Sequence, residues 1–155
     1  MNLEEELLNL VLNSPNAKEI RTISERLEEQ SDFLFSHNAK DLLGVWELRW
    51  SSSKSPFLKY SPFIDNLQIL DPFNSNGLNL LKPRGLPGII GTGILIKLNM
   101  ISEKRIGVRF THAGLIGPDF RMKKIKVLTK IRNEQKGWLD ITYLSNVIRI
   151  CRGDK

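Results

Sequence analysis

The fold is decided by one stretch, Leu42-Leu43-Gly44-Val45-Trp46-Glu47-Leu48-Arg49-Trp50. Before Gly44 the apolar residues recur at helical spacing. After Gly44 the apolar residues alternate with polar ones, which is the pattern of a strand with one buried face. The sequence therefore predicts that helix gives way to sheet at Gly44. We expect a helical lead-in over residues 1–43 and a β domain over residues 44–155.

The chain beyond this boundary contains further short apolar runs separated by turn residues. Regularly spaced short strands favour an antiparallel barrel or sandwich, and an eight-stranded barrel leaves room for side chains or one small ligand. We therefore predict a mainly β fold, an antiparallel barrel of about eight strands. Residues 112–118 are expected to form a loop, as a lid, a membrane-touching tip or a segment folded onto the core. The further strands are predicted over 64–70, 77–81, 89–98, 105–111, 121–132, 138–144 and 147–152.

Two short helices are predicted before the barrel. Residues 3–12 place four apolar side chains on one side, which is typical of an amphipathic helix. Ser14 and Pro15 are an N-cap followed by a first-turn proline, so a second helix is expected over residues 15–30. A further helical turn is predicted at residues 39–43.

Composition narrows the function classes. Cys151 is the one cysteine, so no internal disulfide is expected. With only two histidines beside it, a metal site is not expected either, and we expect no cofactor. No run reaches the ~18 apolar residues of a membrane-spanning helix. The acidic start, Glu4 to Glu6, is unlike a signal or transit peptide, so no targeting segment is expected.

Charge is divided unevenly along the chain. The net charge of +6 combines −5 over residues 1–77 with +11 over residues 78–155. The predicted strand 121–132 places a basic stripe, Lys124, Lys126, Lys130 and Arg132, on one face. This basic stripe is suited to anionic lipid head groups, at about 1 kcal/mol for each charge. The alternative is a solvated face that protects an edge strand. Nucleic acid is disfavoured because no aromatic residues interleave with the stripe.

Catalytic motifs are absent from the sequence. It contains no P-loop, HExxH or GxGxxG pattern. His112, Asp140 and Cys151 are the acid–base candidates worth testing. We predict that the protein is not an enzyme, with a lyase or isomerase acting on a hydrophobic pigment as the alternative.

The motif Gly44-Val45-Trp46 at the helix-to-strand boundary resembles the Gly-x-Trp motif of lipocalins. That resemblance implies an indole that plugs the closed end of the barrel, covered by a basic side chain from the last strand. A cation–π contact of this kind contributes about 0.5–2 kcal/mol. The last strand offers Arg149 and Arg152. Arg152 is favoured because it shares a strand face with Ile148 and Ile150, so Trp46 and Arg152 are predicted to form the barrel-closing pair.

The C-terminal segments 137–144 (GWLDITYL) and 148–155 (IRICRGDK), with the helices leading into residues 42–48, resemble the plastid lipid-associated protein, or fibrillin, family. The resemblance implies a lipocalin-like (calycin-type) barrel and a peripheral place on the cytoplasmic side of the thylakoid or another photosynthetic membrane. It also implies non-enzymatic binding or organisation of prenyl quinones, carotenoids or acyl lipids. In lacking a transit peptide, the chain is similar to a cyanobacterial member.

A hydrophobic small molecule or lipid is therefore the expected partner, with an anionic membrane surface as a second one. The alternative is a partner-binding scaffold with a filled barrel and acidic N-terminal helices. The residues predicted to line the lumen are Trp46, Leu48, Trp50, Val108, Phe110, Val127, Ile141 and Tyr143.

Overall fold

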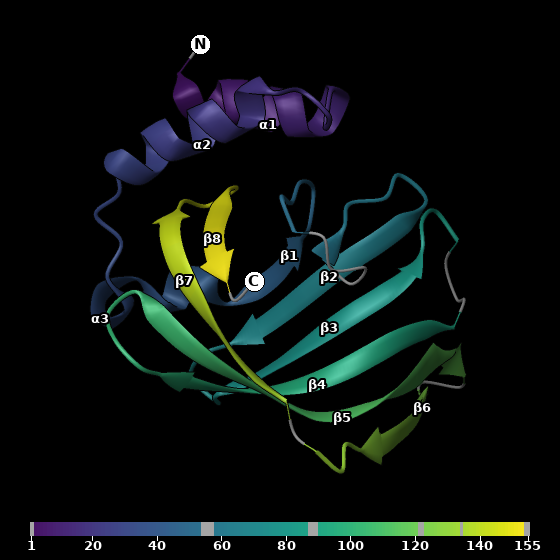
Figure 1. Cartoon of the computed structure of the whole chain (residues 1–155). Coiled ribbons are helices and arrows are strands. Elements are labelled where there is room, and N and C mark those ends of the chain that lie inside the picture. Colours follow the sequence, from purple (N-terminus) through teal and green to yellow (C-terminus); the bar gives the residue numbers. More distant parts are fainter. Residues whose placement is uncertain (1, 54–57, 87–89, 121–122, 134, 154–155) are drawn as a thin grey trace.

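The computed structural model describes residues 2–53, 58–86, 90–120, 123–133 and 135–153, and it confirms a mainly β fold behind two N-terminal helices (Figure 1). The helices are α1 (Leu3–Asn13), α2 (Glu19–Glu29), the one-turn α3 (Phe35–Asn38) and the 3-10 helix η1 (Ala39–Leu42). The strands are β1 (Gly44–Glu47), β2 (Ile64–Asp71), β3 (Asn76–Pro83), β4 (Gly91–Met100), β5 (Arg105–Phe120), β6 (Lys123–Lys130), β7 (Lys136–Leu144) and β8 (Arg149–Gly153).

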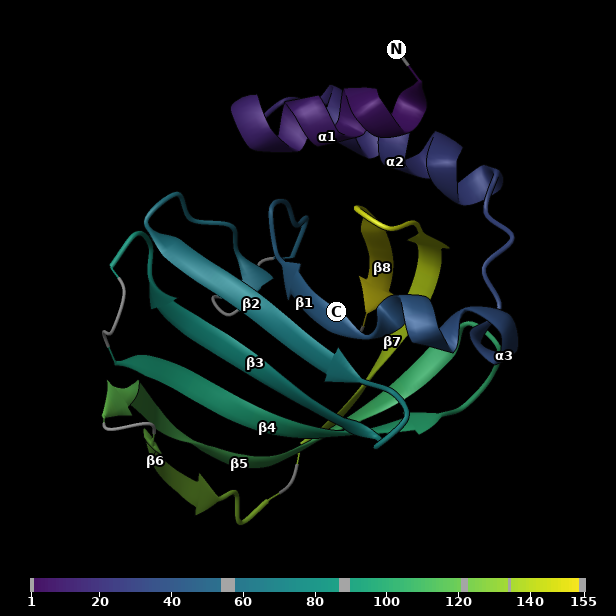
Figure 2. The same ribbon diagram turned by 180° about the vertical axis from the view of Figure 1, so that it is seen from behind.

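The eight strands form one antiparallel sheet that curls into a nearly closed barrel (Figures 1 and 2). The order is β1-β2-β3-β4-β5-β7-β8, and β6 pairs with β5 off this path. Strand β5 pairs with β4 along one edge and with two strands along the other: residues 105–109 pair with β7, and residues 112–120 pair with β6. The prediction of a loop at residues 112–118 was therefore wrong, because pairing with β6 keeps this glycine-containing segment extended.

One end of the barrel is closed by a compact apolar plug. Phe33, Leu42, Ile106 and Ile141 are almost fully buried against one another there. The chain at α3 is fixed to the β4–β5 turn, because the backbone N–H of Phe35 donates to the carbonyl of Glu103 (2.8 Å). Burying each of these large side chains contributes about 1.5–3 kcal/mol, so the plug is a major source of stability.

The helices α1 and α2 lie across the barrel on the side of the β7–β8 turn (Figures 1 and 2). Their facing sides form a second apolar cluster with the turn: Leu7, Val11, Ile20, Ile23, Leu27 and Ile148. Helix α1 has a capping box, in which Asn2 and Glu5 exchange backbone-to-side-chain hydrogen bonds of 2.8 and 3.0 Å. The predicted start of α2 at Ser14-Pro15 was wrong, because Ser14 ends α1 by donating its N–H to the carbonyl of Leu10 (2.8 Å).

Two carboxylates fasten this helix pair to the barrel. Glu28 on α2 accepts hydrogen bonds from Thr142 Oγ1 (2.6 Å) and from Arg152 Nε and Nη2 (2.9 and 2.6 Å). Glu4 on α1 accepts from Tyr143 Oη (2.9 Å) and Ser145 Oγ (2.6 Å). Partial burial raises the pKa of Glu28, but the bonds from Arg152 and Thr142 outweigh it, so the pKa lies below its usual value.

Replacing Glu28 by glutamine tests this attachment. Because the folded-state pKa is depressed, the ionised carboxylate stabilises the fold above about pH 4.5 and loses its effect as pH falls through the folded-state pKa. We expect Glu28→Gln to lower the free energy of unfolding by about 1 kcal/mol at pH 7 and by much less at pH 3. Urea denaturation at both pH values measures this. Glu29→Gln, at the exposed neighbour on α2, is the matched control, and an equal loss at both pH values would contradict the attachment.

Candidate ligand cavity and its buried arginine

A cavity of about 2040 Å³ runs through the barrel and continues under α1 and α2. Its wall is mostly apolar and is built from every strand of the barrel path, from residues 48–53 and from the inner side of the helices. Four of the predicted lumen residues line it: Trp46, Leu48, Trp50 and Phe110. Leu48 and Trp50 do so from the segment after β1, because that strand ends at Glu47.

The strand register explains which side chains face inward. Directly opposed residues of neighbouring strands lie on the same face of a sheet. Trp46 pairs with Gln68, Gln68 with Asn79, and Asn79 with Ile94, and all four line the cavity. These four residues, called the interior ring below, form a row across the inner face of β1 to β4, in which the amides of Gln68 and Asn79 lie between an aromatic and an apolar side chain.

The other four predicted lumen residues do not line the cavity. Ile141 is fully buried in the plug instead. Tyr143 packs against the α1–α2 cluster, because the register of β7 and β8 shifts between Ile141 and Tyr143. Val127 pairs with Leu115 in the β5–β6 extension, which consists of residues 112–120 of β5 and residues 123–130 of β6. Val127 is 64% exposed there. Val108 is half-buried on β5 without being part of the cavity wall.

Arg149 on β8 extends to the interior ring. Its Nη2 donates to Gln68 Oε1 (2.5 Å), and its guanidinium carbon lies 5.1 Å from the centroid of the Trp46 ring. Gln68 Nε2 in turn donates to Asn79 Oδ1 (3.1 Å), and Trp46 Nε1 donates to the carbonyl of Leu42 (3.0 Å). A hydrogen-bonded row therefore crosses the interior from β8 to β3.

The predicted Trp46–Arg152 pair was wrong, and Arg149 takes the place of Arg152. Arg149 bonds Gln68 beside Trp46 and Cys151 packs against the plug, whereas Ile150 packs against the helix cluster and Arg152 bonds to Glu28 of α2. All four border the cavity, which continues under the helices. The face that Arg152 shares with Ile150 is apolar because helices cover it. Alternation alone does not distinguish the outer face of β8, which the helices cover, from its inner face. Only the position of the helices over β8 shows that Arg152 lies on the outer face.

The guanidinium of Arg149 is electrostatically uncompensated in the part of the chain that the structure describes. No carboxylate pairs with it there, and its Nη1 is shielded from solvent without a hydrogen-bond partner. Burial lowers the pKa of Arg149, although an arginine stays charged at neutral pH. Buried charges are ordinarily paired, and an unpaired donor costs about 1–3 kcal/mol, so this site is unusual within the fold.

Of the three acid–base candidates, only Cys151 lines the cavity. Asp140 accepts from Arg105 Nε and Nη2 (2.6 and 2.7 Å), which holds its pKa below the usual value. His112 pairs with Leu95 and lies outside the cavity wall, with its Nδ1 3.2 Å from Thr111 Oγ1. Cys151 does line the cavity, but burial raises the pKa of its thiol. Among the described residues there is no group of three His, Cys, Asp or Glu side chains that could hold a metal, and no helix long and apolar enough to cross a membrane.

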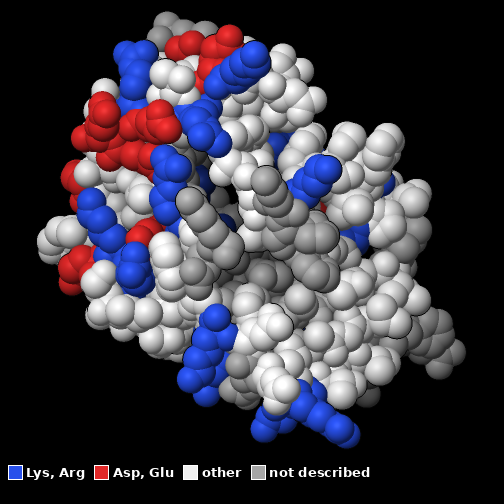
Figure 3. Space-filling model, viewed as in Figure 1, with Lys and Arg blue, Asp and Glu red and all other residues white. Residues whose placement is uncertain are grey.

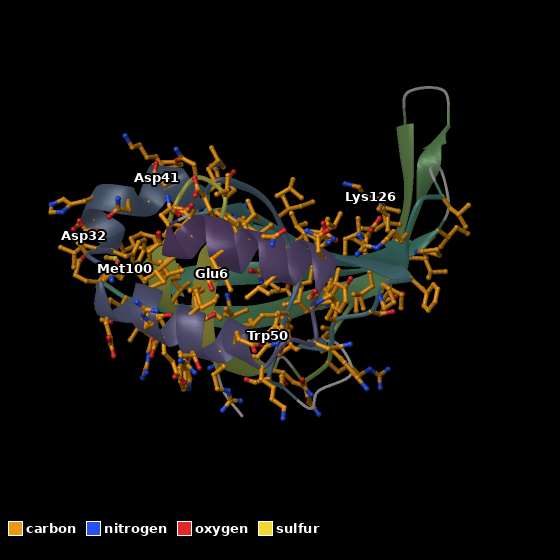
Figure 4. The ribbon with its side chains drawn as sticks, turned by 90° about the horizontal axis from the view of Figure 1, so that it is seen from above. Glu6, Asp32, Asp41, Trp50, Met100 and Lys126 are labelled. Carbon is orange, nitrogen blue, oxygen red and sulfur yellow. The ribbon has the colours of Figure 1, made fainter. Side chains whose placement is uncertain are left out.

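The predicted basic stripe falls on the free edge strand, β6. Lys126 and Lys130 are exposed, and Arg132 is exposed just beyond the strand; the side chain of Lys124 lies outside what the structure describes. Lys126 pairs with Ile116, on the face opposite to the exposed Leu115 and Val127. Figure 4 shows β6 and the distal part of β5 projecting from the barrel. Figure 3 shows basic side chains at this end of the molecule and acidic ones gathered toward the helices.

Substituting Arg149 tests whether its charge is a stabilising lock or an uncompensated group. We expect Arg149→Met to raise the free energy of unfolding by about 1 kcal/mol, because removing a buried unpaired charge recovers its desolvation cost. Arg105→Met is the contrasting control: its guanidinium is bound to Asp140 and lies 4.0 Å from the Trp138 ring centroid, so we expect a loss. Urea denaturation of both variants measures the difference. A loss of 2 kcal/mol or more in Arg149→Met would show that Arg149 mainly holds the barrel closed.

Comparisons with known proteins agree with the barrel and its helical lead-in. Searches of curated proteins and of solved structures found no match. The family model PAP_fibrillin matches residues 4–155, which is nearly the whole chain from α1 to the end of the barrel. The chain therefore belongs to the PAP_fibrillin family of plastid lipid-associated proteins.

Proposed function

We propose that this protein binds or organises hydrophobic small molecules (prenyl quinones, carotenoids or acyl lipids) at photosynthetic membranes, without catalysing a reaction. The observation that carries the proposal is the cavity of about 2040 Å³ inside the barrel. Ligand sites commonly enclose about 300–1,000 Å³, so this space is large enough for a long apolar molecule. Membership of a plastid lipid-associated family supports the same ligand class.

The chemistry of the wall supports binding rather than reaction. Small-molecule sites combine a mostly apolar lining with a few orienting polar groups. Here Trp46, Trp50 and Phe110 supply aromatic surface, and Gln68 and Arg149 supply polar groups. The large cavity counts against the alternative of a scaffold with a filled barrel. His112 and Asp140 do not line the cavity, which counts against a lyase or isomerase.

The helices α1 and α2 are suited to act as the cover of the cavity. Leu7, Val11 and Ile20 line it from above, while Glu28 and Glu4 fasten the helices along the β7–β8 side. Attachment along one side leaves the rest of the cover free of such polar bonds among the described residues. Ligand exchange would then proceed by displacement of the helix pair, with the barrel unchanged.

The β5–β6 extension supports a peripheral place on a membrane. It has one cationic face, with Lys126 and Lys130, and one face with the exposed Leu115 (51%) and Val127 (64%). A projecting amphipathic ribbon combines electrostatic attraction to anionic lipid with shallow apolar contact. The cytoplasmic side of a thylakoid is the surface that we propose.

Ligand binding is tested by mixing the purified protein with thylakoid lipid extract, re-isolating it and analysing an organic extract by mass spectrometry. We expect about one hydrophobic ligand for each chain. Ile94→Trp fills the cavity at the interior ring, so it should retain much less ligand. Lys97→Trp, at an exposed position on the same strand, should retain as much as the unmodified protein. A clean extract from the unmodified protein would refute the proposal.

Membrane attachment is tested by co-sedimentation with vesicles that contain anionic lipid. The double variant Lys126→Glu/Lys130→Glu should bind at least about tenfold more weakly, since each cation near such a surface contributes about 1 kcal/mol. Lys97→Glu/Lys104→Glu changes the net charge equally but away from β6, and should have a smaller effect. Equal loss in both double variants would mean that net charge, rather than the β5–β6 extension, determines binding.

A further inference from the structure

We propose that Arg149 receives the carboxylate of a long-chain acid, so that the cavity prefers acyl chains with a free carboxyl group over neutral lipids. This inference rests on the proposed function and names the ligand class within it. The preference follows from an arrangement inside the barrel: the guanidinium of Arg149, with which no carboxylate of the described residues pairs, borders a mostly apolar cavity.

The position of Arg149 fixes how such a ligand would lie. Arg149 bonds Gln68 of the interior ring, Gln68 bonds Asn79, and the plug at Ile106 and Ile141 closes the barrel on one side. The wall continues from the interior ring past Trp50 to the inner side of α1 and α2. A carboxylate at the interior ring would therefore have its alkyl chain along the apolar wall, toward the helical cover.

The state of the guanidinium identifies the missing partner as an anion. Arg105 on β5 and Arg152 on β8 each bond a carboxylate through two nitrogens. Arg149 bonds the neutral amide of Gln68 through Nη2, and its Nη1 has no partner. Nη1 is shielded, so a small rotation of the guanidinium toward the cavity is part of the proposal.

A carboxylate fits this site better than a neutral carbonyl. Both oxygens of a carboxylate can accept from one guanidinium, and such charge-assisted pairs are roughly twice as strong as neutral hydrogen bonds. A quinone or ester carbonyl would accept a hydrogen bond but would leave the buried charge uncompensated. The cation–π contact with Trp46 lowers the cost of the charge in the empty cavity without neutralising it.

The experiment compares three C16 probes that differ in the head group: palmitate, methyl palmitate and 1-hexadecanol. Each displaces Nile red, a neutral fluorescent dye, from the full-length protein at pH 8. We expect palmitate to bind at least about tenfold more tightly than either neutral probe. In Arg149→Met the preference should fall to about onefold while Nile red still binds. Arg149→Lys should keep part of the preference, and Lys97→Met, which removes an exposed cation outside the cavity wall, should keep all of it.

Each contrary outcome has a distinct meaning. If palmitate and methyl palmitate bind the unmodified protein equally, the inference is overturned while the proposed function stands. If Arg149→Met loses Nile red together with palmitate but remains folded by circular dichroism, Arg149 shapes the cavity and the inference is overturned. If neither Nile red nor any C16 probe binds the unmodified protein, the inference and the proposed function both fail.

Discussion

The contact of Arg149 with Trp46 and Gln68 is the constraint that links the closing of the barrel to the chemistry of its interior. Backbone pairing runs from β1 through β5 to β8, and the described residues show no ladder that joins β8 back to β1. Arg149 spans this junction, because it starts on β8, lies over Trp46 of β1 and bonds to Gln68 of β2. The side chain that spans this junction is thus also a charged group on the cavity wall.

This double position couples the architecture to the proposed chemistry. Because Arg149 spans the junction between β8 and β1, its guanidinium lies beside the cavity. The opposite face of β8 carries Arg152, whose bond to Glu28 holds the helical cover. One short strand therefore contributes both to the wall of the cavity and to the attachment of its cover.

Much of the architecture could be predicted from the sequence because it rests on periodicity. The change from helical spacing to alternation at Gly44 located the start of the barrel. The alternation in residues 105–111 located the first part of β5, and that in residues 138–144 located most of β7. The segment 112–118 was misread because its glycines and proline are typical of loops, while pairing with β6 keeps it in the sheet. Long-range pairing of this kind leaves no local signal.

The candidate site was predictable only in part, for a similar reason. Trp46, Leu48, Trp50 and Phe110 reach the cavity, as their strand faces suggested. Ile141 and Tyr143 follow the same alternation, but Ile141 is buried in the plug. Tyr143 packs against the helices, because the register shifts between these two residues. The choice between Arg149 and Arg152 depended on helices that cover the outer face of β8. Gln68 and Asn79 were missed, since polar residues on a strand ordinarily face solvent.

Nuclear magnetic resonance of palmitate labelled with ¹³C at the carboxyl carbon shows whether a ligand carboxylate meets Arg149 inside the barrel. A carboxylate paired with a guanidinium has a lowered pKa. We expect a bound resonance that stays at the carboxylate position as the pH falls from 8 to about 4. A bound resonance that shifts near the pH at which an exposed carboxyl group titrates would contradict this placement, because the head group would then lie in solvent.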